Sequence, residues 1–192
     1  SSDHGDMLGD HNLWRKTYAY EGSAHVPMIV RMPTGFSHEC REVAAPVMLR
    51  DIMPTVLDVL DLPVPDTVDG ISMKPLMEGR DDCGREYVHG EHATCYSEEQ
   101  EMQYVTNGAY KYIWFPRLNQ EQLFHVEKDP GERENLAGDP EVAGLLQDRT
   151  GDLLMIAGLP ALILAWHLDQ ADRRLYGLMA CYILGLLGAF FY

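Results

Sequence analysis

An abrupt change of character at residue 151 most constrains what this chain can fold into. The 192 residues carry 30 acidic and 15 basic side chains and a net charge of −15. Residues 151–192 contribute three of those acidic and two of those basic side chains and are otherwise mostly apolar. This division predicts an acidic globular part followed by an apolar tail. The negative charge argues against nucleic acid as a partner, because a polyanion would be repelled.

The apolar tail (residues 151–192) contains two uncharged runs, 153–166 and 175–192. The second has 18 residues, about the minimum for a helix that spans a bilayer, and the first has 14. We therefore predict membrane contact through residues 153–192, as one or two helices. The side of the membrane on which residues 1–150 lie stays open, and a buried helical hairpin or a frame-shifted end are alternative interpretations.

Short apolar segments bounded by proline and glycine predict strands and a helix in the acidic part. Residues 26–32 are rich in β-branched side chains and predict a buried strand, with a second short strand at 43–47. Asp51 is a suitable N-cap for a helix over residues 52–60, with Pro54 in its first turn. The apolar side chains that share one face of this helix are Ile52, Val56, Val59 and Leu60.

A hairpin is predicted at Asn107-Gly108, because Asn-Gly between aromatic and β-branched runs is typical of a type I′ turn with positive φ at both residues. The flanking strands are expected at 102–106 and 109–115, and a third strand at 122–126. These segments predict a small antiparallel sheet.

The first loop places groups with metal-binding and anion-binding chemistry close together in the chain. Asp3 and His4 offer a hard carboxylate and an imidazole, and Arg15 and Lys16 follow as two cations. This combination suits a divalent metal beside an anionic ester, since the metal and the lysine both neutralise ester oxygens. A solvated charged loop is the plainer interpretation. His89 and His92, which flank Glu91, are interpreted as structural residues in preference to a second metal site.

Many short motifs resemble the second half of sulfatases in the alkaline phosphatase superfamily. Their order and spacing agree over roughly residues 1 to 147. The run Ser2-Asp3-His4-Gly5-Asp6-Met7-Leu8-Gly9-Asp10-His11 is followed by Leu13-Trp14-Arg15-Lys16, Tyr20-Glu21, Val26-Pro27, Asp51-Ile52-Met53-Pro54-Thr55, Asp69-Gly70, His89-Gly90-Glu91-His92, Lys111-Tyr112, Gln122-Leu123-Phe124, and Asp129-Pro130 with Glu132, Asn135 and Leu136.

We expect the chain to divide into part of a catalytic domain (1–100), a small antiparallel sheet (101–150) and the apolar tail (151–192), which departs from the resemblance. The resemblance implies an α/β, alkaline-phosphatase-like portion of a sulfatase, an enzyme that cleaves a sulfate monoester. It implies Asp3 and His4 as ligands of Ca²⁺ or another divalent metal, and Lys16 as the catalytic group that binds the sulfate ester and stabilises the departing oxygen. His11 matches a family motif as a substrate-binding candidate, with a structural role as the alternative.

The family nucleophile, a formylglycine made from cysteine in a Cys/Ser-x-Pro-x-Arg motif, has no match here, since no cysteine of this chain has proline two residues later. We therefore expect this chain alone to be inactive and the formylglycine to lie in an upstream part. The same motifs leave two alternatives open. One is a phosphonate or phosphate ester hydrolase of the same superfamily. The other is a noncatalytic, membrane-tethered module that uses the acidic loop only to bind ions.

Overall fold

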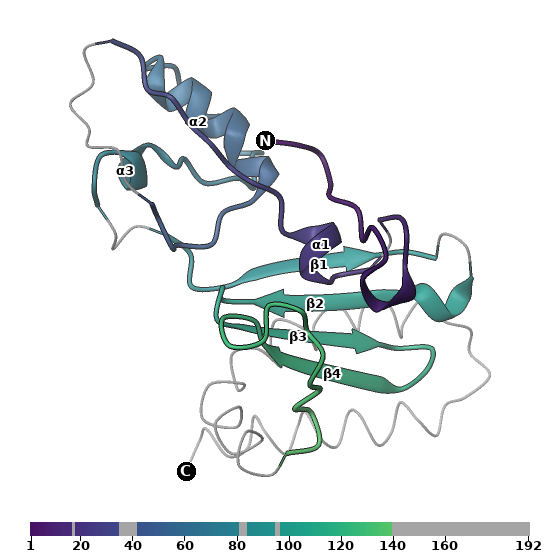
Figure 1. The fold of residues 1–192 in the computed structure, drawn as a ribbon. Coiled ribbons are helices and arrows are strands. Elements are labelled where there is room, and N and C mark those ends of the chain that lie inside the picture. Colours follow the sequence, from purple (N-terminus) through teal and green to yellow (C-terminus); the bar gives the residue numbers. More distant parts are fainter. Residues whose placement is uncertain (17, 35–41, 81–83, 95–96, 140–192) are drawn as a thin grey trace, which may run out of the picture. The chain divides into compact units, whose positions relative to one another are not determined.

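The computed structural model describes residues 1–16, 18–34, 42–80, 84–94 and 97–139 (Figure 1). The predictions for the apolar tail lie outside these residues. None of the helices in the described ranges has the length and hydrophobicity needed to cross a bilayer.

A four-stranded antiparallel sheet with strand order β1-β2-β3-β4 dominates the second half of the described chain (Figure 1). Strands that follow one another in the chain are paired. The sheet begins at β1, a strand that the sequence did not predict, and the other three strands correspond to the expected ones. The strands are β1 (Val88–His92), β2 (Met102–Thr106), β3 (Tyr110–Phe115) and β4 (Gln120–His125).

The hairpin between β2 and β3 is confirmed, but its turn is not type I′. Gly108 has a φ of 90°, whereas Asn107 is not among the residues with positive φ. Asn107 instead accepts hydrogen bonds through Oδ1 from the backbone amides of Ala109 and Tyr110, at 3.0 and 2.8 Å. The side chain of Asn107 thus closes the turn through the local hydrogen bonding that asparagine favours.

One face of the sheet holds the apolar core. Residues alternate along β3, so Lys111, Ile113 and Phe115 share one face and are buried. The first loop of the chain packs against this face through Met7, which is 1% exposed, and through Tyr20. The buried residues of this cluster are Met7, Ala19, Tyr20, Met102, Ile113, Phe115, Phe124 and Val126. The sheet core therefore anchors the loop that carries the candidate site.

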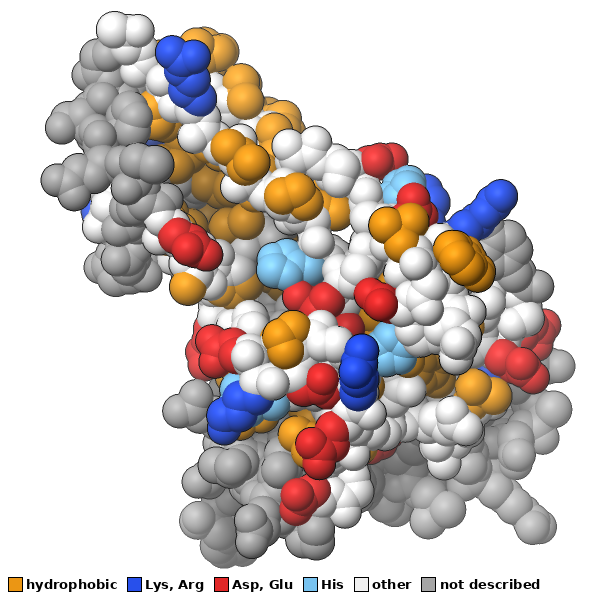
Figure 2. Space-filling model, viewed as in Figure 1, with side chains coloured by type: hydrophobic (Ala, Val, Ile, Leu, Met, Phe, Trp, Pro, Cys, Tyr) orange, Lys and Arg blue, Asp and Glu red, His pale blue; other side chains and the backbone are white. Residues whose placement is uncertain are grey.

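Helices in the first half are short. They are the 3-10 turns η1 (Asp10–Asn12) and η2 (Leu49–Asp51) and the helices α1 (Glu21–Ala24), α2 (Ile52–Val59) and α3 (Lys74–Met77), and a further 3-10 turn, η4 (Glu98–Gln100), precedes β2. The predicted helix over 52–60 is confirmed as α2. Its predicted apolar face is not the buried one, because Ile52, Val56 and Leu60 are 38%, 52% and 60% exposed. Figure 2 shows hydrophobic side chains gathered over the surface where Figure 1 places α2.

The buried side of α2 is built from polar contacts. Asp51 is 1% exposed, and its carboxylate accepts hydrogen bonds from the amides of Met48 and Ile71, at 2.7 and 2.9 Å, and from the Arg85 guanidinium. The Thr55 hydroxyl donates to the Asp51 carbonyl and accepts from the Met73 amide. Asp51 occupies the predicted N-cap position, but its side chain holds the 70–73 segment and Arg85 in place of capping α2.

The strands predicted at 26–32 and 43–47 are wrong, since both segments lack regular secondary structure. Ile29 is 84% exposed and Val30 47% exposed. β-branched composition favours an extended backbone, but a strand also needs a neighbour to complete its hydrogen bonds. No segment within the described ranges pairs with either stretch.

Candidate active site

Asp3 and His4 lie at the start of the first loop with their donor atoms close together. His4 Nε2 is 3.7 Å from Asp3 Oδ2, and the Asp3 side chain is 86% exposed. The other ring nitrogen of His4, Nδ1, lies 2.8 Å from the carbonyl oxygen of Gly5. This contact orients the imidazole so that Nε2 faces the carboxylate. The pair predicted to bind a metal is therefore accessible and oriented.

The next residues form a tight loop with an unusual backbone. Leu8, Gly9, His11 and Asn12 all have positive φ, at 50°, 109°, 52° and 60°. Residues other than glycine adopt such angles at an energetic cost, which clusters at functional or tightly constrained sites. Hydrogen bonds from the Asp10 amide to Met7 and from the Gly9 amide to Leu13 close the loop, at 2.9 and 2.8 Å. The buried Met7 side chain fixes its base.

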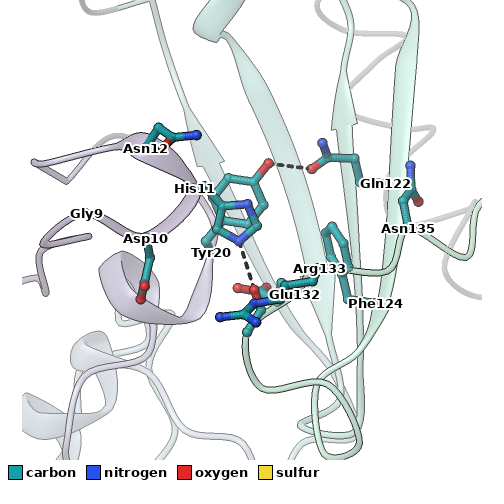
Figure 3. Close-up of a pocket in the computed structure, with 11 residues that line it drawn as sticks. Gly9, Asp10, His11, Asn12, Tyr20, Gln122, Phe124, Glu132, Arg133 and Asn135 are labelled. Carbon is teal, nitrogen blue, oxygen red and sulfur yellow. Dashed lines mark hydrogen bonds between the residues drawn. The ribbon is translucent and has the colours of Figure 1, made fainter.

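His11 lies in a pocket on the sheet side of this loop. Its ring stacks on Tyr20 with centroids 4.0 Å apart and an interplanar angle of 5°. Its Nε2 atom is 3.0 Å from the Gly131 carbonyl, and the Tyr20 hydroxyl donates to Gln122 at 2.9 Å (Figure 3). The pocket has a volume of about 470 Å³, and Asp3, His4 and Lys16 are not among its lining residues. The structure thus groups His11 with the 131–135 turn.

Lys16 is exposed and, within the part of the chain that the structure describes, forms no ion pair with a carboxylate. An exposed ammonium is accessible to an anionic ligand. The predicted candidates therefore divide into Asp3, His4 and Lys16, which lie outside the pocket, and His11, which lines it.

A buried ion cluster that the sequence did not predict joins three distant segments. The Lys111 ammonium on β3 contacts the carboxylate of Glu21 and lies 2.9 Å from Glu132 Oε1. Lys111 and Glu132 are each 2% exposed, and Glu21 is 26% exposed. His25 contacts the other oxygen of Glu21. We call Glu21, Lys111 and Glu132 the buried ion cluster.

The two carboxylates of the cluster respond differently to burial. Burial opposes ionisation of Glu21, but the charge and hydrogen bond of Lys111 outweigh it and lower the pKa of Glu21. Burial is also the largest influence on Glu132, and there it prevails and raises the pKa of that carboxyl, although Lys111 and the Glu21 amide favour the charged form. A lysine on the inward face of β3, beside Ile113 and Phe115, is the sequence signal that could have revealed the cluster.

Another pair of residues from the motifs that carried the resemblance, Asn135 and Leu136, binds the edge strand β4. Asn135 Oδ1 accepts from the amide of Leu123, and the amide of Leu136 donates to the Leu123 carbonyl, at 3.0 and 2.8 Å. These bonds hold the 129–136 turn along β4, and with it Glu132. Residues separated by more than a hundred positions in the chain are thus brought into one structural unit.

A complete metal site is not formed by the described residues, among which no group of three or more His, Cys, Asp or Glu side chains could hold an ion. His89 and His92 lie three residues apart on β1, so they point to opposite faces of the strand. They therefore do not combine into one site, in agreement with their interpretation as structural residues.

Comparison with known proteins identifies the relatives of this chain. The family model described as "N-sulphoglucosamine sulphohydrolase, C-terminal" matches residues 9–156. An arylsulfatase of Clostridium perfringens is 42% identical over 142 residues, which cover 73% of this chain and 29% of the relative. A match over this share of the chain establishes its family.

Two solved structures show the same fold. A 2-O GAG sulfatase matches with a TM-score of 0.72 and 29% identity, covering 90% of this chain and 38% of its own. The phosphonate monoester hydrolase of Agrobacterium radiobacter matches with a TM-score of 0.65 and 28% identity, covering 82% and 34%. The chain therefore spans about a third of the length of the relatives that it matches.

Proposed function

Because this chain belongs to the N-sulphoglucosamine sulphohydrolase C-terminal family, we propose that its protein is a sulfatase that hydrolyses a sulfate monoester. The observation that carries the proposal is the loop of residues 3–16. It presents an exposed carboxylate, an oriented imidazole and an exposed ammonium within one short segment. These are the groups that would bind a metal ion and an anionic ester together.

Asp3 and His4 fit a role as two ligands of a divalent metal, with Ca²⁺ as the expected ion. Two donor atoms that each lie about 2.3 to 2.6 Å from one ion are at most about 5 Å apart. The separation of 3.7 Å between Asp3 Oδ2 and His4 Nε2 satisfies this limit. The bound ion would neutralise negative charge on the ester oxygens. Because the described residues supply two donors, the proposal requires further ligands from elsewhere in the protein.

Lys16 supplies the second positive charge of the proposed site. Its ammonium would bind the sulfate ester and donate a hydrogen bond to the oxygen that departs, where negative charge develops. His11 is the substrate-binding candidate with less support, because its ring is already stacked on Tyr20 and in contact with Gly131. The nucleophile, expected to be formylglycine, is placed by this proposal outside the 192 residues, since none of their cysteines lies in the required motif.

Phosphonate or phosphate ester hydrolysis is the alternative function. It is supported by the similarity to the phosphonate monoester hydrolase, which is comparable in identity to that of the 2-O GAG sulfatase. The same loop chemistry suits both esters, because each places anionic oxygens near a metal and a lysine. The higher identity to an arylsulfatase, 42%, favours the sulfatase.

Membrane association through residues 153–192 is a separate proposal, which rests on the sequence of the apolar tail. The other alternative function, a noncatalytic module that is tethered to the membrane and only binds ions, depends on the same tail. Carbonate extraction of membranes from cells that express the protein tests it. Retention in the membrane pellet supports the proposal, and complete release contradicts it.

Steady-state kinetics of the full-length protein with an aryl sulfate and an aryl phosphonate monoester test the proposed activity. We expect the sulfate to have the higher kcat/KM. Lys16→Ala should lower that kcat/KM by about 10² to 10³, the scale for loss of one electrostatic stabiliser. Lys128→Ala, which removes another exposed ammonium, is the matched control and should retain activity. A silent Lys16→Ala variant would contradict the assignment, and a preference for the phosphonate would favour the alternative.

A further inference from the structure

The buried ion cluster requires an explanation because an apolar residue would suit its place in the sheet. Lys111 lies on the face of β3 that also carries Ile113 and Phe115. Removing an ammonium from water is costly, and a buried ion pair recovers that cost only with good geometry. Such pairs are in some proteins retained for specific positioning of segments rather than for stability. The contacts of the cluster indicate which segment is positioned.

Glu132 fixes the start of α1. Its Oε2 atom accepts a hydrogen bond from the Glu21 backbone amide at 2.6 Å, while its Oε1 atom lies 2.9 Å from the Lys111 ammonium. The Lys111 ammonium in turn contacts the Glu21 side chain. Both the backbone and the side chain of Glu21 are therefore held by the cluster. Since α1 has four residues and begins at Glu21, holding Glu21 fixes the whole helical turn.

The helical turn α1 lies directly against the residue that follows the candidate metal ligands. The Gly5 amide donates to the Ser23 carbonyl at 2.9 Å. A Cβ atom on Gly5 would be 2.1 Å from the Gly22 carbonyl oxygen, so the two backbones are in close contact. Gly5 also bears the carbonyl that orients His4. A continuous series of contacts thus runs from Lys111 and Glu132 through α1 to Gly5 and His4.

We propose that Lys111 and Glu132 are positioning residues that hold the Asp3-His4 pair in place through Glu21 and α1. The proposal rests on the proposed function for its metal, because it assigns Asp3 and His4 as the ligands that are positioned. Its structural half, the fixing of Gly5 by the cluster, stands on the contacts alone. The proposal assigns neither residue a contact with the ester.

Glu132→Ala and Glu132→Gln in the full-length protein test the proposal. The measurements are the dissociation constant of Ca²⁺, by calorimetry, and hydrogen exchange of the Gly5 and Glu21 amides. Glu132→Ala removes the acceptor of the Glu21 amide and a partner of Lys111. We expect faster exchange at both amides and Ca²⁺ binding weakened by about 10- to 100-fold, the range for partners that orient metal ligands. Glu134→Ala, which removes an exposed carboxylate two residues away, is the matched control and should change neither quantity.

Glu132→Gln keeps the size of the side chain and an acceptor oxygen, so it provides a folded variant if Glu132→Ala does not fold. Its neutral hydrogen bond is weaker than the charge-assisted one, and we expect a loss of Ca²⁺ affinity of about threefold with partly restored amide protection. Wild-type Ca²⁺ affinity and wild-type exchange at Gly5 in the folded variants would overturn the proposal. If the parent protein binds no Ca²⁺, the proposed function fails, while exchange at Gly5 still decides whether the cluster positions the loop.

Discussion

The strands of the sheet and the helix α2 differ in the side chains that they bury. In the sheet region, β1 to β4 with the loop 7–20, the strands bury apolar residues such as Met102, Ile113 and Phe124 at 2% exposure or less. In the α2–α3 region, residues 48–80 with 84–85, Met73 and Leu76 are buried, but α2 itself buries Pro54 and Thr55, next to the buried Asp51, and exposes Ile52 and Val56. Periodicity of apolar residues thus identifies the buried face in the first region and the exposed face in the second.

This difference shows that the groups packed against an element decide which of its side chains are buried. The sheet meets an apolar loop, so burial of apolar area drives its packing. The α2–α3 region meets backbone amides and Arg85, so an ionised carboxylate with four hydrogen bonds takes the buried position. Stability should therefore depend on side-chain volume at the apolar positions of the sheet, and on charge at Asp51.

Asp51→Ala should have the largest effect on stability and tests the dependence on charge. It leaves the largely buried Arg85 without its carboxylate, and breaking such a pair costs about 3 to 5 kcal/mol. The measurement is the free energy of unfolding by urea. The control is Asp58→Ala, which removes a partly exposed carboxylate of α2 and its ion pair with Lys74 and should cost about 1 kcal/mol or less. Equal losses in the two variants would contradict the contrast.

The same carboxylate predicts how stability depends on pH. Burial opposes its ionisation, but the hydrogen bonds from Arg85, Ile71 and Met48 prevail and lower the pKa of Asp51. Below the unfolded pKa of about 3.9, the unfolded chain binds the proton more readily, so this contribution falls as pH drops toward the folded pKa. Urea unfolding from pH 7 to pH 3 should show this loss in the wild type. Asp51→Asn should show a smaller loss, and identical pH profiles would refute the assignment.

The volume dependence of the sheet is tested by Ile113→Val. Ile113 is fully buried, so loss of one methylene should destabilise by about 0.5 to 1.5 kcal/mol. Thermal unfolding measures the effect. A variant as stable as the wild type would show that the core on this face is not closely packed.

The smallest effect is expected for Val56→Ala on the exposed face of α2. Val56 is 52% exposed, and surface substitutions of this kind change stability by about 0.5 kcal/mol or less. The same thermal unfolding experiment serves as the measurement. A loss of stability comparable to that of Ile113→Val would show that Val56 is covered in solution, and would contradict the difference between α2 and the sheet.

Local patterns in the sequence predicted some of the elements but few of their partners. The β2–β3 hairpin and α2 follow from turn residues and apolar spacing within ten or so residues, and both are present. The strand predicted at 26–32 failed because strand formation depends on a neighbour that local composition does not specify. The exposed face of α2 was misjudged because Arg85 and Ile71, which fix its buried side, lie far along the chain.

Prediction of the candidate site was limited in the same way, because local patterns do not identify partners that lie far along the chain. Asp3, His4 and Lys16 could be named from sequence because they lie within one loop and match family motifs. The buried ion cluster could not, since Lys111 and Glu21 are 90 residues apart and no local pattern links them. Lys111 in an otherwise apolar alternation was the one visible sign, and it identified neither of its partners.

The central claim, that this loop forms part of a metal-dependent ester hydrolase site, is tested most directly by the Ca²⁺ dependence of Asp3→Ala. In the full-length protein, kcat/KM for an aryl sulfate is measured against Ca²⁺ concentration. Loss of a hard, charged ligand should shift the Ca²⁺ requirement to higher concentration and lower activity together. Asp6→Ala, which removes another exposed carboxylate of the same loop, should behave as the wild type. Activity of Asp3→Ala with an unchanged Ca²⁺ dependence would contradict the account.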